Sequence, residues 1–405
     1  MKNIRLEIGE PTVVYQNQIE AGNKWGYYQF PCADFTKSGD IALTFNTTPD
    51  NVHDKQDSNS TQTVISEDGG KTWRLKTPND HLISNARMPN GCYFRGFDVV
   101  TSVVADYIEK YQPVAKGMYN TNIYFKKDIK ELNEVYTCRE FDPSTNTLHT
   151  FHADVKMWDH AAVGVWSGNR LLPGAYAFAM ANASGIMMLD DTLFLCTYLQ
   201  GIDYFADSRE EALCVLKNGR AYYSACVFRS TDCGRSWELY SQILSDDDII
   251  LSDTPHLEGL CEPMMAKMPD GSVVMLIRSG GNFNALFPSY LSRSTDGCKT
   301  WSKPQKFDSI GVFPQIVALD CGVSLASYGR PGLFLRATSD PAGLEWEAPI
   351  EIPLSDGEEQ RSCYYTQLLP IDAHTALFFY SDFHHPLPEG SGEGKAILMR
   401  KITVY

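Results

Sequence analysis

The sequence lacks three features that would place it in other classes of protein. It has no run of about 18 apolar residues, which argues against a membrane-spanning helix. Its 11 cysteines include no C-x-x-C pair, so we expect free thiols in a reducing compartment rather than a disulfide framework or a zinc site. Its 35 Lys and Arg are outnumbered by 50 Asp and Glu, and the formal net charge of −15 disfavours nucleic acid and anionic membranes as partners.

The stretch 1–16 also lacks the apolar core of a signal peptide, so we expect a soluble, cytoplasmic protein. Two places could suggest a metal ion, the pair His384-His385 and the aspartates at 246–248. Adjacent histidines on a strand point to opposite faces, and an acidic run is typical of a solvated loop. We therefore expect no metal and no cofactor.

A repeated octet is the most informative feature that the sequence does contain. Residues 66–73, SEDGGKTW, match in full the pattern S-x-D-x-G-x-T-W, known as the Asp-box. Residues 230–237 differ only by Ser for Thr, residues 294–301 carry their glycine one place early, and residues 338–346 are a decayed copy with one extra residue. In this hairpin turn, Asp and Ser or Thr side chains hydrogen-bond the local backbone while Trp packs into the sheet.

The spacing of the boxes indicates a β-propeller. Their tryptophans fall at 73, 237, 301 and 346. The last two intervals are one blade each if blades run roughly 40 to 50 residues plus insertions, and the first leaves room for two blades without a box. We therefore predict an all-β fold, a six-bladed β-propeller, as a single domain over residues 1–405 with inserted loops near 81–160 and 201–220.

Strands are also predicted at both ends of the chain. Residues 25–45 are predicted to form two strands around a turn at 37–40. Strands at 375–380 and 396–404 are predicted to pair with residues 4–15, so that no sheet edge is left exposed.

The stretch 261–302 is predicted to form one blade. Glu262 opens an apolar run, Pro-Asp-Gly at 269–271 is a turn signal, and the strand 272–277 leads to Arg278. This hairpin returns Arg278 close to Glu262.

The Asp-boxes, together with Glu262-Pro263 ahead of Arg278, resemble the sialidase (neuraminidase) superfamily of six-bladed β-propellers. That family has an Arg in an F/Y-R-I-P motif in the first blade, a loop Asp before the first Asp-box, and a Glu before a second Arg. A third Arg and a Tyr follow in the last two blades. The resemblance implies an exo-glycosidase whose partner is a carbohydrate, the terminal sugar of a glycan or oligosaccharide.

The family's functional residues can be carried over position by position. The loop acid is Asp54, with Asp57 as the near alternative; the glutamate is Glu262, the second arginine Arg278, the third Arg330, and the tyrosine Tyr365, with Tyr364 close behind. The resemblance assigns Tyr365 as nucleophile and Glu262 as its base, because the carboxylate on a sialoside's anomeric carbon would repel an anionic nucleophile. It assigns Asp54 as acid and base, and the arginines as a clamp on the substrate carboxylate.

One position departs from the family pattern. The F/Y-R-I-P site reads Tyr-Gln-Phe-Pro at 28–31, so Gln29 stands where the first arginine would be. Three explanations stay open: Arg87 or Arg95 replaces that arginine, the substrate is a neutral or uronic sugar that suits an amide, or the propeller binds a glycan without cleaving it. Because Tyr365, Glu262 and two arginines are present, we favour a hydrolase of a terminal sialic-acid-like sugar.

Overall fold

The computed structural model describes residues 4–16, 25–48, 61–102, 108, 110–118, 121–156, 161–166, 185–249, 257–280, 286–356, 360–387 and 392–405. Strands dominate these residues, which also include the helix α2 (Arg209–Ala212) and a 3-10 helix at Lys126–Asp128. No helix in these ranges is long and apolar enough to cross a membrane. The fold is an all-β, six-bladed β-propeller, which confirms the predicted fold class.

The chain divides into two compact units. The terminal unit comprises Met1–Ser84, Ala266–Leu276 and Asp308–Tyr405, and the middle unit comprises Asn85–Met265 and Ile277–Phe307. We describe each unit by itself, and the single-domain organisation stays a prediction.

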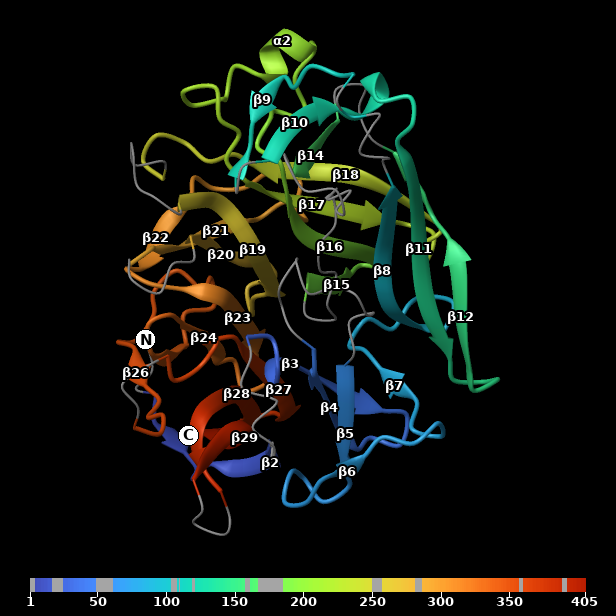
Figure 1. The fold of residues 1–405 in the computed structure, drawn as a ribbon. Coiled ribbons are helices and arrows are strands. Elements are labelled where there is room, and N and C mark those ends of the chain that lie inside the picture. The colour runs from blue at the N-terminus through green and yellow to red at the C-terminus, as the bar shows by residue number, and fades with distance from the viewer. Residues whose placement is uncertain are drawn as a thin grey trace. The chain divides into compact units, whose positions relative to one another are not determined.

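Three sheets belong to the terminal unit (Figure 1). The first has the order β6-β5-β4-β3-β7, with strands β3 (Gln29–Thr36), β4 (Ile41–Asn46), β5 (Thr61–Ser66), β6 (Arg74–Leu75) and β7 (Leu82–Ile83). The second has the order β23-β24-β25-β26, with strands β23 (Val312–Ala318), β24 (Ser324–Gly329), β25 (Leu333–Thr338) and β26 (Ile350–Glu351). The third has the order β1-β29-β28-β27, with β2 also on β29, and contains β1 (Leu6–Ile8), β2 (Thr12–Gln16), β27 (Thr366–Asp372), β28 (Thr375–Pro386) and β29 (Glu393–Val404).

The other sheets have the orders β12-β11-β8, β14-β10-β9, β13-β18-β17-β16-β15 and β19-β20-β21-β22. Their strands are β8 (Tyr93–Ser102), β9 (Ala115–Lys116), β10 (Thr121–Phe125), β11 (Asn133–Asp142), β12 (Thr147–His152), β13 (Asp154–Lys156), β14 (Ala162–Trp166), β15 (Ile186–Leu189), β16 (Thr192–Leu199), β17 (Ser224–Ser230), β18 (Ser236–Ile243), β19 (Leu257–Lys267), β20 (Val273–Gly280), β21 (Ser289–Ser294) and β22 (Gln305–Asp308).

The two ends of the chain share one sheet, as predicted. Strand β1 pairs with β29 in the register Leu6 opposite Val404, and β2 pairs with the same strand further along, Thr12 opposite Met399. The predicted hairpin at residues 25–45 is likewise present as β3 and β4. Alternating apolar side chains explain both results, since Leu43, Phe379 and Ile397 are buried together in the core of the terminal unit.

Residues 81–160, for which loops were expected, hold strands β7 to β13. The longest of them, β8 and β11, pair from Tyr93 opposite Phe141 to Ser102 opposite Asn133, with a register shift at Arg139/Glu140. The shift and the exposed face of β12 interrupt the apolar alternation that identifies a strand in a sequence. Residues 201–220, the other expected insertion, hold α2 and turns.

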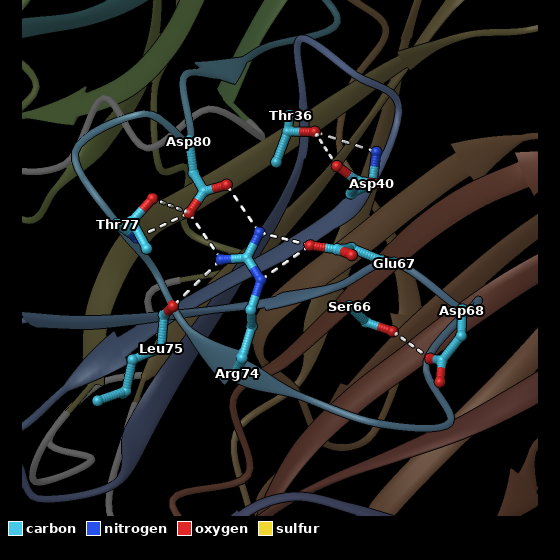
Figure 2. A network of polar contacts seen from close by, with 9 residues as sticks. All are labelled: Thr36, Asp40, Ser66, Glu67, Asp68, Arg74, Leu75, Thr77 and Asp80. Atoms are coloured by element: carbon cyan, nitrogen blue, oxygen red, sulfur yellow. Dashed lines mark hydrogen bonds and ion pairs between the residues drawn. The ribbon is translucent and has the colours of Figure 1, made fainter.

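The Asp-box at 66–73 shows how the motif fixes a turn. Asp68 accepts hydrogen bonds from the Thr72 hydroxyl (2.7 Å) and the Thr72 amide (2.9 Å), and Ser66 Oγ donates to Asp68 Oδ1 (2.9 Å; Figure 2). Trp73 Nε1 donates to the Gly70 carbonyl at 3.2 Å. The boxes at 230–237 and 338–346 repeat this last bond, with Trp237 donating to Gly234 (3.1 Å) and Trp346 donating to Gly343 (2.9 Å).

In the box at 294–301 the tryptophan has a different hydrogen-bond acceptor, and Cys298 stands where the other boxes have glycine. Cys298 is fully buried and has a positive φ of 67°. Trp301 Nε1 donates to Ser241 Oγ at 3.0 Å, and Ser241 Oγ donates to the Cys298 carbonyl at 2.6 Å. The Ser241 hydroxyl therefore links Trp301 to the Cys298 carbonyl. In the other three boxes the tryptophan donates directly to the carbonyl at the corresponding position.

The hydrogen bonds of Asp68 predict acid sensitivity. The Thr72 hydroxyl and then the Thr72 amide lower the pKa of Asp68 to about 2, from an ordinary value of 3.8. Because the folded-state pKa lies below the unfolded one, this stabilisation is present above pH 3.8 and is lost as the pH falls towards 2. We expect Asp68→Asn to lower the urea midpoint at pH 6 and the difference from wild type to shrink between pH 4 and pH 2.

The matched control for this experiment is Asp320→Asn, at an exposed aspartate of the same unit. The control should match wild type at every pH. A difference between wild type and Asp68→Asn that is the same at pH 6 and pH 2 would contradict the assignment.

Candidate functional site

The middle unit brings Glu262 and Arg278 together, as the predicted hairpin requires. Glu262 lies on β19 and Arg278 lies on β20, and both side chains are buried. Arg278 Nη1 donates to Glu262 Oε1 at 2.6 Å. The predicted closeness of the two residues is therefore confirmed, and the structure shows in addition that they form an ion pair.

A second carboxylate, Glu258, completes a group that the sequence analysis missed. Arg278 Nη2 donates to Glu258 Oε1 at 3.0 Å, and Arg278 Nε donates to the Gly280 carbonyl at 2.9 Å. We name Arg278, Glu258 and Glu262 the Arg278 cluster. Each of its side chains is no more than 8% exposed. A signal for Glu258 existed, because residues at i and i+4 of a strand lie on one face and an acid among apolar residues needs a buried partner.

The charges of the Arg278 cluster do not balance, because one guanidinium faces two carboxylates. The Cys261 thiol donates to Glu258 Oε2 at 3.2 Å, and burial together with the Glu258 charge raises the pKa of that thiol well above its ordinary value. All three guanidinium nitrogens of Arg278 already donate to protein oxygens. Because Nη1 and Nη2 each carry a second N–H, these bonds leave donors on Arg278 besides those that contact the glutamates. The clamp role of Arg278 stays a prediction.

The backbone of Glu262 is held in the left-handed region, with φ of 43°, although the residue precedes Pro263. Phe30 (φ 58°) and Phe313 (φ 39°) share this feature, and each also precedes a proline. The register of β3 shifts at Phe30, and that of β23 shifts at Phe313. Because three blades repeat this proline-linked irregularity, we assign the strain at Glu262 to the propeller framework.

The terminal unit brings together two other predicted residues, Arg330 and Tyr365. The Tyr365 side chain is 8% exposed and its ring lies flat on Phe313, with centroids 4.7 Å apart and planes at 4°. Phe30 meets the same ring edge-on at 5.0 Å. The Cζ atom of Arg330 is 5.6 Å from the Tyr365 ring centroid, and Arg330 Nη2 donates to the Cys363 carbonyl at 2.9 Å.

A tryptophan extends this group. Arg330 Cζ lies 6.0 Å from the Trp25 ring centroid, and Trp25 packs edge-on against Phe30 at 6.3 Å. We name Trp25, Phe30, Phe313, Tyr365 and Arg330 the aromatic cage. Rings over a guanidinium attract it electrostatically and exclude water from it, which strengthens any charge pairing that it makes. Sequence reasoning missed the three ring partners of Tyr365 and Arg330, because no local pattern brings residues from 25, 30 and 313 together.

Gln29, at the start of β3, is fully buried. Neither its amide nitrogen nor its amide oxygen has a hydrogen-bond partner among the described residues. A buried amide without hydrogen bonds lowers the stability of a protein by about 1–3 kcal/mol. A ligand that hydrogen-bonds the Gln29 amide would therefore remove this cost.

The other predicted residues lie elsewhere. Arg87 is exposed and lies over the Tyr93 ring at 5.9 Å, and Arg95 is half-buried on β8. Both belong to the middle unit, whereas Gln29 belongs to the terminal unit, and their role as substitutes for the missing arginine stays a prediction. Asp54 and its alternative Asp57 fall outside the described residues.

Comparisons with known proteins agree with the propeller architecture. A family model described as "BNR repeat-like domain" matches residues 143–310. This match covers less than half of the chain and agrees with the repeated boxes of the sequence and with the predicted resemblance to the sialidase superfamily, while membership of that superfamily stays a prediction. No curated protein sequence matches the chain.

Solved structures are similar to this chain at low sequence identity. A protein of unknown function from Dyadobacter fermentans is 17% identical, with 99% of each chain covered and a TM-score of 0.59. An α-L-arabinanase of Penicillium chrysogenum, solved with arabinobiose, is 13% identical over 97% of this chain and 98% of its own, with a TM-score of 0.48. A Hadza microbial sialidase is 14% identical over 92% of this chain and 65% of its own, with a TM-score of 0.48.

Proposed function

We propose that this protein is an exo-glycosidase that hydrolyses a terminal sialic-acid-like sugar. The observation that carries the proposal is the contact between Arg330 and Tyr365 inside the aromatic cage, with the guanidinium 5.6 Å from the phenol ring. A planar guanidinium is the preferred donor to a carboxylate. A phenol is the nucleophile suited to an anomeric carbon that carries one.

The cage supports these two roles physically. Phe313 and Phe30 hold the Tyr365 ring between a flat and an edge contact, and this packing fixes the orientation of the ring. A nucleophile held in one position lowers the entropic part of the barrier to attack.

The remaining roles rest on the resemblance. Glu262 is the proposed base that activates Tyr365, Asp54 is the proposed acid that protonates the leaving oxygen, and Arg278 is the proposed second carboxylate ligand. The attack forms the bond from the Tyr365 oxygen to the anomeric carbon and breaks the glycosidic bond. Water then releases the sugar.

The second candidate is a propeller exo-glycosidase that acts on a neutral or uronic sugar. Two observations favour it: the uncharged amide of Gln29, which has no hydrogen-bond partner among the described residues, and the pairing of the Arg278 charge with two carboxylates, Glu258 and Glu262. A glutamine amide can both donate and accept hydrogen bonds, as a sugar hydroxyl can, and therefore suits a neutral sugar. A propeller that binds a glycan without cleaving it is the non-enzymatic alternative.

The substitution Gln29→Arg separates these candidates. On an aryl sialoside we expect the variant to keep the kcat/KM of wild type or to raise it by up to about a hundredfold, because a charge-assisted hydrogen bond is worth about 1.5–3 kcal/mol. On a neutral aryl glycoside, the same change should lower kcat/KM, because it places a guanidinium beside a hydroxyl.

The measurement is kcat/KM of both proteins on a panel of aryl glycosides, with thermal unfolding as the check that the variant folds. Turnover of neutral glycosides alone would establish the second candidate. Glycan binding without turnover of any panel member would establish the binding propeller.

A further inference from the structure

Lys395, on β29 of the terminal unit, is a buried cation that the proposed mechanism does not use. The side chain is 4% exposed. Its Nζ lies 4.2 Å from the Phe383 ring centroid and donates to the Tyr27 carbonyl at 3.4 Å. Lysine is rarely buried to this degree, because an ammonium group taken out of water loses strong hydration.

The surroundings of Lys395 connect it to Arg330. Phe383 packs edge-on against Trp25 at 6.3 Å, and Trp25 is the ring that lies 6.0 Å from Arg330 Cζ. Cys363 is a second shared neighbour, because its carbonyl accepts the hydrogen bond from Arg330 and its thiol acts electrostatically on Lys395. Trp25 and Phe383 thus form a continuous aromatic contact that has Arg330 at one end and Lys395 at the other.

Lys395 also lies against the segment that leads into Gln29. Its hydrogen-bond acceptor, Tyr27, is close in the chain to Gln29, whose buried amide has no partner among the described residues. Burial lowers the pKa of Lys395 to about 8, against the opposing effect of Cys363. Burial disfavours the charged form of such an ammonium group, and a bound anion stabilises that form by replacing part of the interaction with water.

We propose that Lys395 is a substrate-binding residue, which supplies beside Arg330 the positive charge that Gln29 does not carry, and that its ligand is the carboxylate of a terminal acidic sugar. This inference rests on the proposed function. It also explains how the chain can hold an acidic sugar with glutamine at position 29: the ammonium takes over the charge, and the amide of Gln29 is left to donate a neutral hydrogen bond.

The test is the preference for a free acid over its ester. We would measure binding of N-acetylneuraminic acid and of its methyl ester by isothermal titration, using the full chain and the variant Lys395→Met, which keeps the apolar stem but removes the charge. Wild type should bind the acid more tightly than the ester, and Lys395→Met should lose about ten- to a hundredfold of that preference. The double variant Gln29→Arg, Lys395→Met should regain it.

The matched control is Lys401→Met, on the same strand but exposed, which should keep the wild-type preference. Lys395→Gln gives the same comparison if the methionine variant does not fold. A wild type that prefers the acid, with charge-removing variants that keep this preference, would overturn the role of Lys395 and leave the proposed function standing. A wild type that binds acid and ester equally would overturn both.

Discussion

Replacing Arg278 by methionine should lower the free energy of unfolding by about 3–5 kcal/mol, because the change leaves Glu258 and Glu262 as two buried carboxylates without their counter-ion. The measurement is urea denaturation at pH 7, with the midpoint and the slope compared with those of wild type. The triple variant Arg278→Met, Glu258→Gln, Glu262→Gln removes all three charges together. It should recover most of the loss.

Arg74 provides the matched control, because it also pairs with two carboxylates but its side chain is exposed to solvent. Its guanidinium contacts Glu67 at 2.7 Å and Asp80 at 2.7 Å, and its side chain is 41% exposed (Figure 2). Water solvates these charges once the partner is gone, so Arg74→Met should shift the urea midpoint far less than Arg278→Met. Equal shifts for the two variants would mean that burial does not control the energetics of the Arg278 cluster.

The propeller could be predicted because its signals are local. The aspartate of the box at 66–73 makes its hydrogen bonds within one turn, to Ser66 and Thr72, so the residues that form the turn are adjacent in the sequence and can be recognised there. The closeness of Glu262 and Arg278 could be predicted for a related reason, since one hairpin joins them. Strands β8, β11 and β12, within residues 81–160, were not predicted, because a register shift and an exposed face interrupt the alternation that identifies a strand.

Candidate site residues were named from the sequence only where a family motif marked them. Arg330 and Tyr365 were named in this way; the structure places them in contact, and their roles stay predictions. Trp25 and Phe313 were missed because packing between distant segments leaves no periodic trace in a sequence. Lys395 was missed for a different reason, since a lysine near the end of a strand is ordinarily solvated and only its burial against Phe383 distinguishes it.

Replacing Tyr365 by phenylalanine should lower kcat/KM on an aryl sialoside by at least about a thousandfold, because the variant keeps the ring and its contact with Phe313 but lacks the attacking oxygen. Its stability should stay close to that of wild type, since the packing of the cage is unchanged. The measurement is steady-state kinetics together with thermal unfolding. The matched control is Tyr364→Phe at the neighbouring buried tyrosine, which should retain activity.

A covalent label identifies the nucleophile independently of the rate. A fluorinated glycosyl fluoride forms a long-lived glycosyl-enzyme, because fluorine next to the anomeric centre destabilises the oxocarbenium-like transition state of its hydrolysis. We expect mass spectrometry of the digested protein to place this label on Tyr365. A label on a carboxylate such as Glu262 would mean that the nucleophile is an anion. The substrate would then carry no carboxylate on its anomeric carbon, because such a group would repel an anionic nucleophile. The acidic-sugar proposal would then give way to the neutral one, since a tyrosine nucleophile is needed only where the anomeric carbon carries a carboxylate.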